Sequence, residues 1–471
     1  MIKKTLLLLS IPVSFVYLQA QDISVITNTA DVYSGNPING TAKYNAMAGS
    51  IGALGGDISS ANVNPAGIGV FITNDLNLTL GVNSNKNTTS LLGKSLNYKI
   101  NNTDISNTGG VLTINLGDTG SKWKFVNIGI NYASQSLENY SESAGNDNIK
   151  IVDNFSFPDK VINYRFLGHA YNREGDQSKM NFAVGANYDN QLYFGAGLNF
   201  HNSLLRQYDT AGFYSDDDQT SLDYNKQYTP YEEHSDGFSA NIGMIAKLGN
   251  QFRVGAALES PTWWSIDRVF NQYYFGTNSD ELGGGDRRLV TPMKATLSAA
   301  FVPSKNFALN VDFIQGITKP KYDVVTESEQ ELNDFFSDSY KNSSEVRVGA
   351  EYRIAAFRLR GGYAYQGNNV DNLSLLSYND NGSASNQSYS NLLVGKRNTF
   401  GAGLGYDFQA FYIDASYQNI TSEYSSPFLQ GNVDKNTGYF NGGYDVNGEA
   451  FAVSKVKNTR SNFFVTLGWK F

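Results

Sequence analysis

The C-terminal segment constrains the fold of this chain more than any other part of its sequence. From Ser461 to Phe471, large apolar residues alternate with mostly smaller or polar ones; the apolar face carries Phe463, Val465, Leu467, Trp469 and Phe471. A period of two indicates a β-strand with one apolar face. Lipid offers no partners to backbone N–H and C=O groups, so a sheet that spans a membrane has to close on itself. A last strand that ends on an aromatic residue therefore predicts a barrel in a bacterial outer membrane. Trp469 and Phe471 would be its signal to the barrel-assembly machinery.

The N-terminus predicts export. Lys3 and Lys4 precede the apolar run Leu6 to Leu18, and Ala20 offers a small residue for cleavage before Gln21. This is the pattern of a secretory signal peptide, which we assign to residues 1–20. No later segment approaches the ~18 uninterrupted apolar residues that a membrane-spanning helix needs.

Composition excludes several classes of function. The chain has a net charge of −8, which makes nucleic acid an unsuitable partner. It contains no Cys, so it has neither a disulfide nor a thiolate metal site. With 30 Tyr, 29 Phe, 46 Gly and only 17% charged residues, it suits an all-β protein with aromatic belts and small residues facing a lumen.

Alternation along the chain predicts fourteen strands, an even number that returns the C-terminus to the side where the first strand starts. The candidates lie near 75–85, 109–117, 123–134, 180–189, 191–203, 235–248, 251–260, 291–302, 305–316, 344–354, 356–367, 397–408, 410–420 and 461–471. Long connections near 86–108, 135–179, 204–234, 261–290, 317–343, 368–396 and 421–460 alternate with short turns such as Asp189-Asn190 and Gly249-Asn250. Long outer loops and short periplasmic turns are typical of an outer-membrane barrel. We therefore assign residues 73–471 to a transmembrane antiparallel β-barrel of about 14 strands.

One segment is not a strand. Between Gln21 and Ile72 the alternation gives way to Ala, Gly, Ser and Asn, centred on 41–49 and on 62–67. Small residues permit close packing of short helices and turns, and a segment before the first strand can fold back into a wide lumen. Residues 21–72 are thus predicted to form an N-terminal hatch, or plug, inside the barrel.

Several segments in this order resemble the FadL/TodX family of outer-membrane transporters for hydrophobic compounds. The likeness rests on the Gly/Ala-rich run that ends in Asn64-Pro65-Ala66, on 292–295 with Asp312 and Phe313, on 345–349 and on 400–406. The resemblance covers nearly the whole mature chain. It implies a fourteen-stranded barrel plugged by a hatch, a monomer surrounded by outer-membrane lipid, and passive uptake of long-chain fatty acids or aromatic hydrocarbons. The alternative is a general porin, or a structural or ligand-binding barrel.

Besides the C-terminal aromatic residues, three groups of residues are candidates for a functional site. We predict that Asn64, Pro65 and Ala66 set the conformation of the hatch and act as a gate. The alternative is that they form an ordinary turn before a strand. Pro65 fixes its own φ and restricts the backbone of Asn64. Trp263 and Trp264 would form either an interfacial aromatic girdle or a patch that captures an apolar ligand. Inward charges are expected to pair with one another, although one Arg could bind a fatty-acid carboxylate through its planar fork; these are Arg347, Arg358, Arg360, Asp312 and Asp414.

Catalysis has little support. The three histidines, His169, His201 and His234, lack the spacing of metal ligands, and no nucleophile-elbow motif is present. The glycines between Gly49 and Gly69 precede no Gly-Lys-Ser/Thr, so a phosphate cradle is not expected. We predict neither an enzyme nor a metal or cofactor site.

Overall fold

The computed structural model describes residues 23–117, 120–153, 162–226, 229–273, 280–428 and 450–471. The predicted signal peptide, residues 1–20, lies outside them. Within the described residues, no helix is long and apolar enough to cross a membrane.

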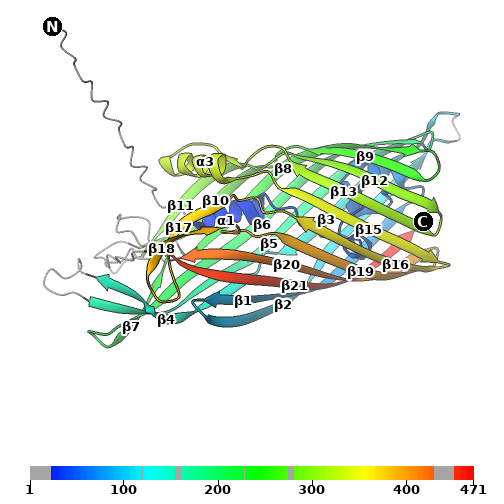
Figure 1. The fold of residues 1–471 in the computed structure, drawn as a ribbon. Coiled ribbons are helices and arrows are strands. Elements are labelled where there is room, and N and C mark those ends of the chain that lie inside the picture. The colour runs from blue at the N-terminus through cyan, green and yellow to red at the C-terminus, as the bar shows by residue number, and fades with distance from the viewer. Residues whose placement is uncertain (1–22, 118–119, 154–161, 227–228, 274–279, 429–449) are drawn as a thin grey trace, which may run out of the picture.

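The wall is a closed 14-strand antiparallel β-barrel, as predicted (Figure 1). Closure comes from the pairing of the first strand with the last, which runs from Asp75↔Lys470 to Ser90↔Lys455. The wall strands, in the order in which they pair, are β1 (Asp75–Leu91), β2 (Lys94–Asn115), β3 (Trp123–Ser136), β5 (Ile162–Tyr188), β6 (Leu192–Ser215), β8 (Tyr231–Leu248), β9 (Phe252–Glu259), β12 (Lys294–Ser304), β13 (Phe307–Gly316), β15 (Ser344–Ile354), β16 (Phe357–Gln366), β19 (Arg397–Asp407), β20 (Phe411–Phe428) and β21 (Ala452–Lys470). Each of them contains most of one predicted strand.

The two faces of the wall strands differ as the alternation predicted. In β6, Phe194 and Phe200 are 41% and 49% exposed, whereas Asn199 between them is fully buried. In β21, Phe463 and Trp469 face outward, and Thr466 is buried. The outer belt is aliphatic and aromatic; it includes Leu80, Ile128, Ile130, Val184, Leu198, Ile242, Leu297, Phe313, Phe400 and Leu404. This belt is the surface that a lipid bilayer would cover.

The two ends of the barrel are unlike. At one end, short turns such as Gly249-Gln251 and Phe408-Ala410 join neighbouring strands, and Phe471 ends the chain. The connections at the other end are elaborate, and we call it the outer end because outer-membrane barrels carry long loops outside the cell. Its additional elements are β4 (Asn139–Asp153), β7 (Thr220–Asn225), β10 (Trp263–Tyr273), β11 (Asp280–Val290), β14 (Lys321–Tyr322), α3 (Glu327–Ser339), β17 (Leu373–Tyr378) and β18 (Ala384–Tyr389).

Several predicted loops are wrong, because strands continue through them. The predicted connection 86–108 is part of a ladder between β1 and β2 that ends only at Leu91↔Lys94. Leu92 and Gly93 alone make the turn, both with positive φ. Likewise β5 begins at Ile162 and β21 at Ala452, inside segments predicted to be loops. Beyond the apolar belt both faces of a strand contact water or other polar groups, so the alternation that marks a strand fades there.

Short helices fill the lumen, as the fold prediction requires (Figure 1). They are α1 (Ile23–Asn28), the π-helical turn η1 (Thr29–Tyr33), α2 (Ala42–Ala46), and the 3-10 helices η2 (Ile58–Asn62) and η3 (Pro65–Val70). Met47, Ile51, Ala61 and Ile68 within this segment are fully buried. We refer to residues 23–72 as the plug.

Wall glycines let the plug backbone touch the barrel. A Cβ on Gly195 of β6 would lie under 3.0 Å from the backbone of Pro65 and Ala66, and one on Gly362 of β16 would meet the backbone of Met47 equally closely. Real Cβ atoms do not approach backbone atoms that closely, so these positions accept only glycine without movement. The lumen-facing glycines expected from composition thus act as contact points for the plug.

Gly195→Ala should destabilise the plugged barrel by about 1–3 kcal/mol, the usual cost of overpacking a close contact. The measurement is the thermal midpoint of the purified protein in detergent, followed by the loss of heat-modifiable migration in gel electrophoresis. Gly361→Ala is the matched control, because its Cβ would come no closer than 3.9 Å to the nearest atom. Equal midpoints for the two variants would contradict the close packing of η3 on β6.

Candidate functional site

Asn64, Pro65 and Ala66 lie where the plug meets the wall. Asn64 caps η3: its Oδ1 accepts a hydrogen bond from the N–H of Ala66 at 3.1 Å. Its Nδ2 donates to the carbonyl of Gly52 in the plug at 2.9 Å and to that of Met244 in β8 at 3.1 Å. The Asn64 side chain is fully buried, so these bonds face no competition from water. One side chain therefore ties two turns of the plug to one wall strand.

A second attachment point involves Asp312 of β13. Its carboxylate accepts hydrogen bonds from the backbone N–H groups of Ile51 and Gly52, at 2.9 and 3.2 Å. Asn310 accepts a further one from Ala53 at 3.2 Å. A buried carboxylate is thus used to hold plug backbone and not to pair with an inward Arg.

The other predicted inward charges do pair. Arg347 is bound by Glu345 at 2.7 Å and donates to the hydroxyl of Tyr44 in α2 at 3.0 Å. Arg360 joins Glu351 and Asp414, at 2.7 and 2.6 Å. Arg358 pairs with Asp407 at 3.3 Å. None of these three guanidiniums is without a carboxylate partner.

Trp263 and Trp264 begin β10 and point to opposite faces. Trp263 is 49% exposed and stacks near Phe238, with 6.3 Å between ring centroids. Trp264 is 3% exposed and packs edge-on against Tyr33 of the plug at 5.2 Å. Only Trp263 is placed for a girdle or a capture surface.

The C-terminal aromatic residues lie on the outer face at the short-turn end. Trp469 is 45% exposed and pairs in register with Phe411 of β20 and Leu76 of β1. Phe471 is 73% exposed and exchanges backbone hydrogen bonds with Asn74. Both side chains are accessible from outside the barrel, and their role as an assembly signal stays a prediction.

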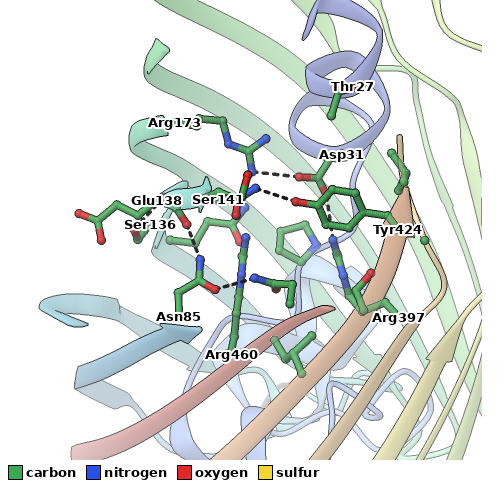
Figure 2. Close-up of a pocket in the computed structure, with 18 of the residues that line it drawn as sticks. Thr27, Asp31, Asn85, Ser136, Glu138, Ser141, Arg173, Arg397, Tyr424 and Arg460 are labelled. Atoms are coloured by element: carbon green, nitrogen blue, oxygen red, sulfur yellow. Dashed lines mark hydrogen bonds and ion pairs between the residues drawn. The ribbon is translucent and has the colours of Figure 1, made fainter. Parts of the chain in front are cut away.

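A cavity of about 210 Å³ lies between the plug and the wall, toward the outer end (Figure 2). Its lining mixes apolar side chains, among them Ile23, Ile38, Ile420, Val394 and Phe464, with many Asn and Ser side chains from β1, β3 and β21. A smaller cavity of about 180 Å³ lies below the plug and is lined largely by charged side chains, including Lys43, Asp57, Glu351, Arg360 and Asp414. The plug separates the two.

Asp31 of η1 is the carboxylate at the centre of the outer cavity, and two arginines hold it (Figure 2). Arg173 of β5 approaches one of its oxygens at 3.0 Å, and Arg397 of β19 the other at 2.9 Å. Burial alone would raise the pKa of Asp31, but attraction to Arg173, Arg397 and Arg460 outweighs it and holds the pKa far below its ordinary value. Asp31 is therefore an anion at every physiological pH.

Further polar bonds attach the same part of the plug. Asn28 donates to Gln207 and to the Tyr231 hydroxyl, at 3.2 and 2.7 Å. Tyr33 donates to Glu233 at 2.9 Å. Burial and the nearby Glu233 carboxylate raise the pKa of Tyr33 well above its ordinary value, so its hydroxyl stays a donor. The segment from Asn28 to Tyr33 is thus bound to the wall on several sides.

Sequence reasoning did not single out Asp31, Arg173, Arg397 or Arg460. Arg173 and Arg460 fell in segments predicted to be loops, although both belong to wall strands. Arg397 stood at the first position of a predicted strand, where its facing was undetermined. The sequence did contain a signal for Arg460. In the last strand the even-numbered residues Asn462, Phe464 and Thr466 face the lumen, and the same alternation extended toward the N-terminus places Arg460 on that face.

The described residues hold no group of three or more His, Asp or Glu side chains that could bind a metal ion. His169 and Asp209 form a buried pair at 2.7 Å near the outer end, with the imidazole stacked on Phe428 at 4.0 Å. His201 contacts Ser239 at 3.0 Å, and His234 contacts Glu232 at 2.6 Å. Each histidine thus has its own, separate environment.

Comparison with solved structures identifies the architecture. A FadL homologue of Pseudomonas aeruginosa matches with a TM-score of 0.59 at 12% sequence identity, over 92% of this chain and 98% of the other. The toluene transporter TodX of Pseudomonas putida matches with a TM-score of 0.53 at 12% identity, over 92% and 98%, and the toluene transporter TbuX of Ralstonia pickettii with 0.52 at 12%, over 92% and 99%. This chain has the FadL fold. No protein-family model and no curated protein matches the sequence.

Asp31→Asn should destabilise the protein by about 3 kcal/mol, because Arg173, only 2% exposed, would be left without a carboxylate. The measurement is the thermal midpoint in detergent, together with the rate of proteolysis within residues 23–33. Asp371→Asn is the control: its ion pair with Lys341 is about half exposed on both sides and should contribute little. A midpoint no lower than that of the control would mean that the Arg173 pair does not hold the plug.

The contribution of Asp31 should depend on pH in a defined direction. Its pKa is lowered in the folded state, so the ion pair stabilises the protein fully above the unfolded pKa of about 3.9 and less as the pH falls below it. We expect the difference in thermal midpoint between the wild-type protein and Asp31→Asn to stay constant from pH 8 to 5 and to narrow below pH 4. A difference that already narrows between pH 7 and 5 would contradict the lowered pKa.

Proposed function

We propose that this protein resides in the bacterial outer membrane and mediates passive uptake of hydrophobic compounds, such as long-chain fatty acids or aromatic hydrocarbons. The observation that carries the proposal is the combination of a closed barrel, a lumen filled by a plug that polar bonds hold to the wall, and a cavity with apolar side chains between that plug and the wall, toward the outer end. The named structural neighbours with this fold transport toluene, in the case of TodX and TbuX.

The physical basis of uptake is partition. An apolar molecule that leaves water for the outer cavity gains about 0.8 kcal/mol for each CH₂ group that it buries. Its concentration gradient then drives passage once the plug yields. Asn64, Pro65 and Ala66 are the proposed gate, since they join η3 to β6 and β8.

We further propose that residues 1–20 are a cleaved signal peptide, that residues 21–72 act as the hatch and 73–471 as the barrel, and that the protein works as a monomer assembled by the barrel-assembly machinery. Closure of the wall within a single chain supports the monomer. The terminal aromatic residues Trp469 and Phe471, exposed at the short-turn end, support recognition by the assembly machinery.

A general porin is the alternative, and the buried plug disfavours it. Met47 and Asn64 in the middle of the plug are fully buried, whereas a diffusion pore needs continuous water-filled space. An enzyme in the barrel wall would need an assembled nucleophile or metal site, and the fold of the named neighbours belongs to transporters.

The test is uptake of radiolabelled oleate and toluene by cells that express the intact protein. We expect saturable uptake of at least one of them, and a rate at least about twofold higher in the Asn64→Ala/Pro65→Ala double variant, because that change removes the cap and the bond to β8. Folded protein is compared by heat-modifiable migration. Asn381→Ala, in an exposed outer loop, is the control.

No uptake of either compound, together with leakage of small polar solutes, would favour the porin. If uptake is saturable but the double variant takes up the compounds at the same rate, the proposed transport function stands and the proposed gate at Asn64, Pro65 and Ala66 is wrong.

A further inference from the structure

Four lysines gather on the outward face of the wall at the outer end of the barrel. They lie on three neighbouring strands, β1, β2 and β21, which run side by side in the sheet (Figure 1). The four are Lys86 of β1, Lys99 of β2, and Lys455 and Lys457 of β21, and each of them is exposed. We call this group the lysine patch.

The register places the four side chains next to one another. Lys86 pairs directly with Lys99, and residues that pair directly across antiparallel strands project from the same face with their Cβ atoms about 5 Å apart. Lys457 pairs with Thr88, which makes it a diagonal neighbour of Lys86 at roughly 7–8 Å. Lys455 lies two residues before Lys457, on the same face of β21. The lysine patch is therefore continuous across three strands.

The wall itself balances only part of this charge. Lys457 forms one ion pair, with Glu423 of β20 at 3.6 Å, and both side chains are mostly exposed, so the pair is weak. Within the described residues, Lys86, Lys99 and Lys455 form no ion pair. Two like charges directly opposite each other destabilise a sheet. An anion bound from outside would relieve the repulsion between Lys86 and Lys99.

Acidic residues prevail on another part of the same rim. At the outer ends of β5, β6 and β8, the outward face carries Glu174, Asp176, Glu232 and Asp236. Arg206 of β6, which lies among these acids, is bound by Glu232. The lysine patch is therefore a local feature of one sector of the wall and does not reflect the general composition of the rim.

The lysine patch lies just beyond the apolar belt. On β1 the outward residues Leu80 and Val82 belong to the belt, and Val82 pairs with the exposed Phe463 of β21. Lys86 is four residues beyond Val82, which is about 13 Å along the strand and about 10 Å of height at the usual tilt of barrel strands. A lysine stem can lie along apolar surface while its ammonium reaches polar groups. The ammonium groups are thus at the level of the lipid headgroups.

We propose that the lysine patch binds the phosphate groups of an outer-leaflet lipid that carries more than one phosphate. The inference goes beyond the proposed uptake function and rests only on the proposed location in the outer membrane. A lipid with several phosphates suits the patch because one phosphate can lie between Lys86 and Lys99 while another reaches Lys455 and Lys457. Ammonium groups on flexible stems bind phosphate as point charges and need no fixed geometry. The lipid would lie outside the wall, away from the lumen and its cavities.

The experiment measures the equilibrium binding of bisphosphorylated lipid A to the intact purified protein in a nonionic detergent, by titration in native mass spectrometry. Dephosphorylated lipid A, which keeps the sugars and the acyl chains, is the comparison ligand. Three proteins are compared: wild type, Lys86→Gln/Lys99→Gln and Lys122→Gln/Lys305→Gln. The last is the matched control, because it removes the same charge from two exposed lysines at the short-turn end.

We expect the wild-type protein and the control variant to bind bisphosphorylated lipid A at least about tenfold more tightly than the dephosphorylated form. Added salt should weaken this preference, since charges on a surface are screened beyond about 10 Å at 0.1 M. Lys86→Gln/Lys99→Gln should lose the preference. In detergent without lipid, the thermal midpoint of this variant should equal or exceed that of the wild-type protein, because the change removes a pair of like charges.

The proposal is wrong if the wild-type protein does not prefer the phosphorylated lipid, or if Lys86→Gln/Lys99→Gln retains the preference. An equal loss of preference in both double variants would also overturn it, since net charge alone would then explain the binding. A lower thermal midpoint of Lys86→Gln/Lys99→Gln in detergent without lipid would assign the two lysines to folding and overturn the proposal as well. Uptake of oleate and toluene is measured separately, so each of these results leaves the proposed uptake function standing.

Discussion

The pairing of β1 with β21 is the contact on which the rest of the structure depends. In lipid, each unpaired backbone N–H or C=O costs several kcal/mol, so a wall of this kind is stable only without free edges. The ladder from Asp75↔Lys470 to Ser90↔Lys455 removes both edges at once. Because the sheet is closed, every wall strand has an inside, and the buried polar contacts between the wall and the plug lie there.

That interior is organised around the plug. Its backbone contacts the wall where Gly195 and Gly362 leave space, and its free N–H groups are bound by Asp312 and Asn310. Charged pairs provide the remaining attachments, with Arg347 near α2 and Arg173 near η1. Packing of backbone on glycine gives close fit, and buried polar bonds specify one position for the plug. The outer cavity and the charged lower cavity are the volumes between the plug in this position and the wall that protein atoms do not fill.

The sequence was sufficient to predict those parts of the fold that contact with lipid determines. Strand alternation, the even strand count and the glycine-rich segment before Asp75 all reflect a wall with an apolar outside and a filled inside. The outer ends of the strands were not predictable in the same way. Around Asn87 and Tyr98, for example, neither side of the hairpin faces lipid, so a paired strand there has the composition of a loop.

The sequence predicted only those site residues that belong to a recognisable local pattern. Asn64 stands in a motif with a recognisable backbone role, and the structure places it at the contact between plug and wall. The three arginines around Asp31 can be recognised as a site only after the fold has brought them together. Arg173, Arg397 and Arg460 come from three strands that are separated by long stretches of sequence. No local pattern reports that three distant guanidiniums surround the one carboxylate of Asp31.

The position of the closing seam also imposes an order of assembly. The first and last wall strands are the pair that seals the cylinder, so the ring cannot be completed before the final strand has been synthesised and inserted. The plug lies on the N-terminal side of that seam and is anchored by bonds to β5, β8, β13 and β19. A sealed wall would offer it no side entrance. Once the seam is closed, the plug can reach these bonds only through an end of the barrel, so the closing of the wall limits the routes by which the plug can leave or return to its place.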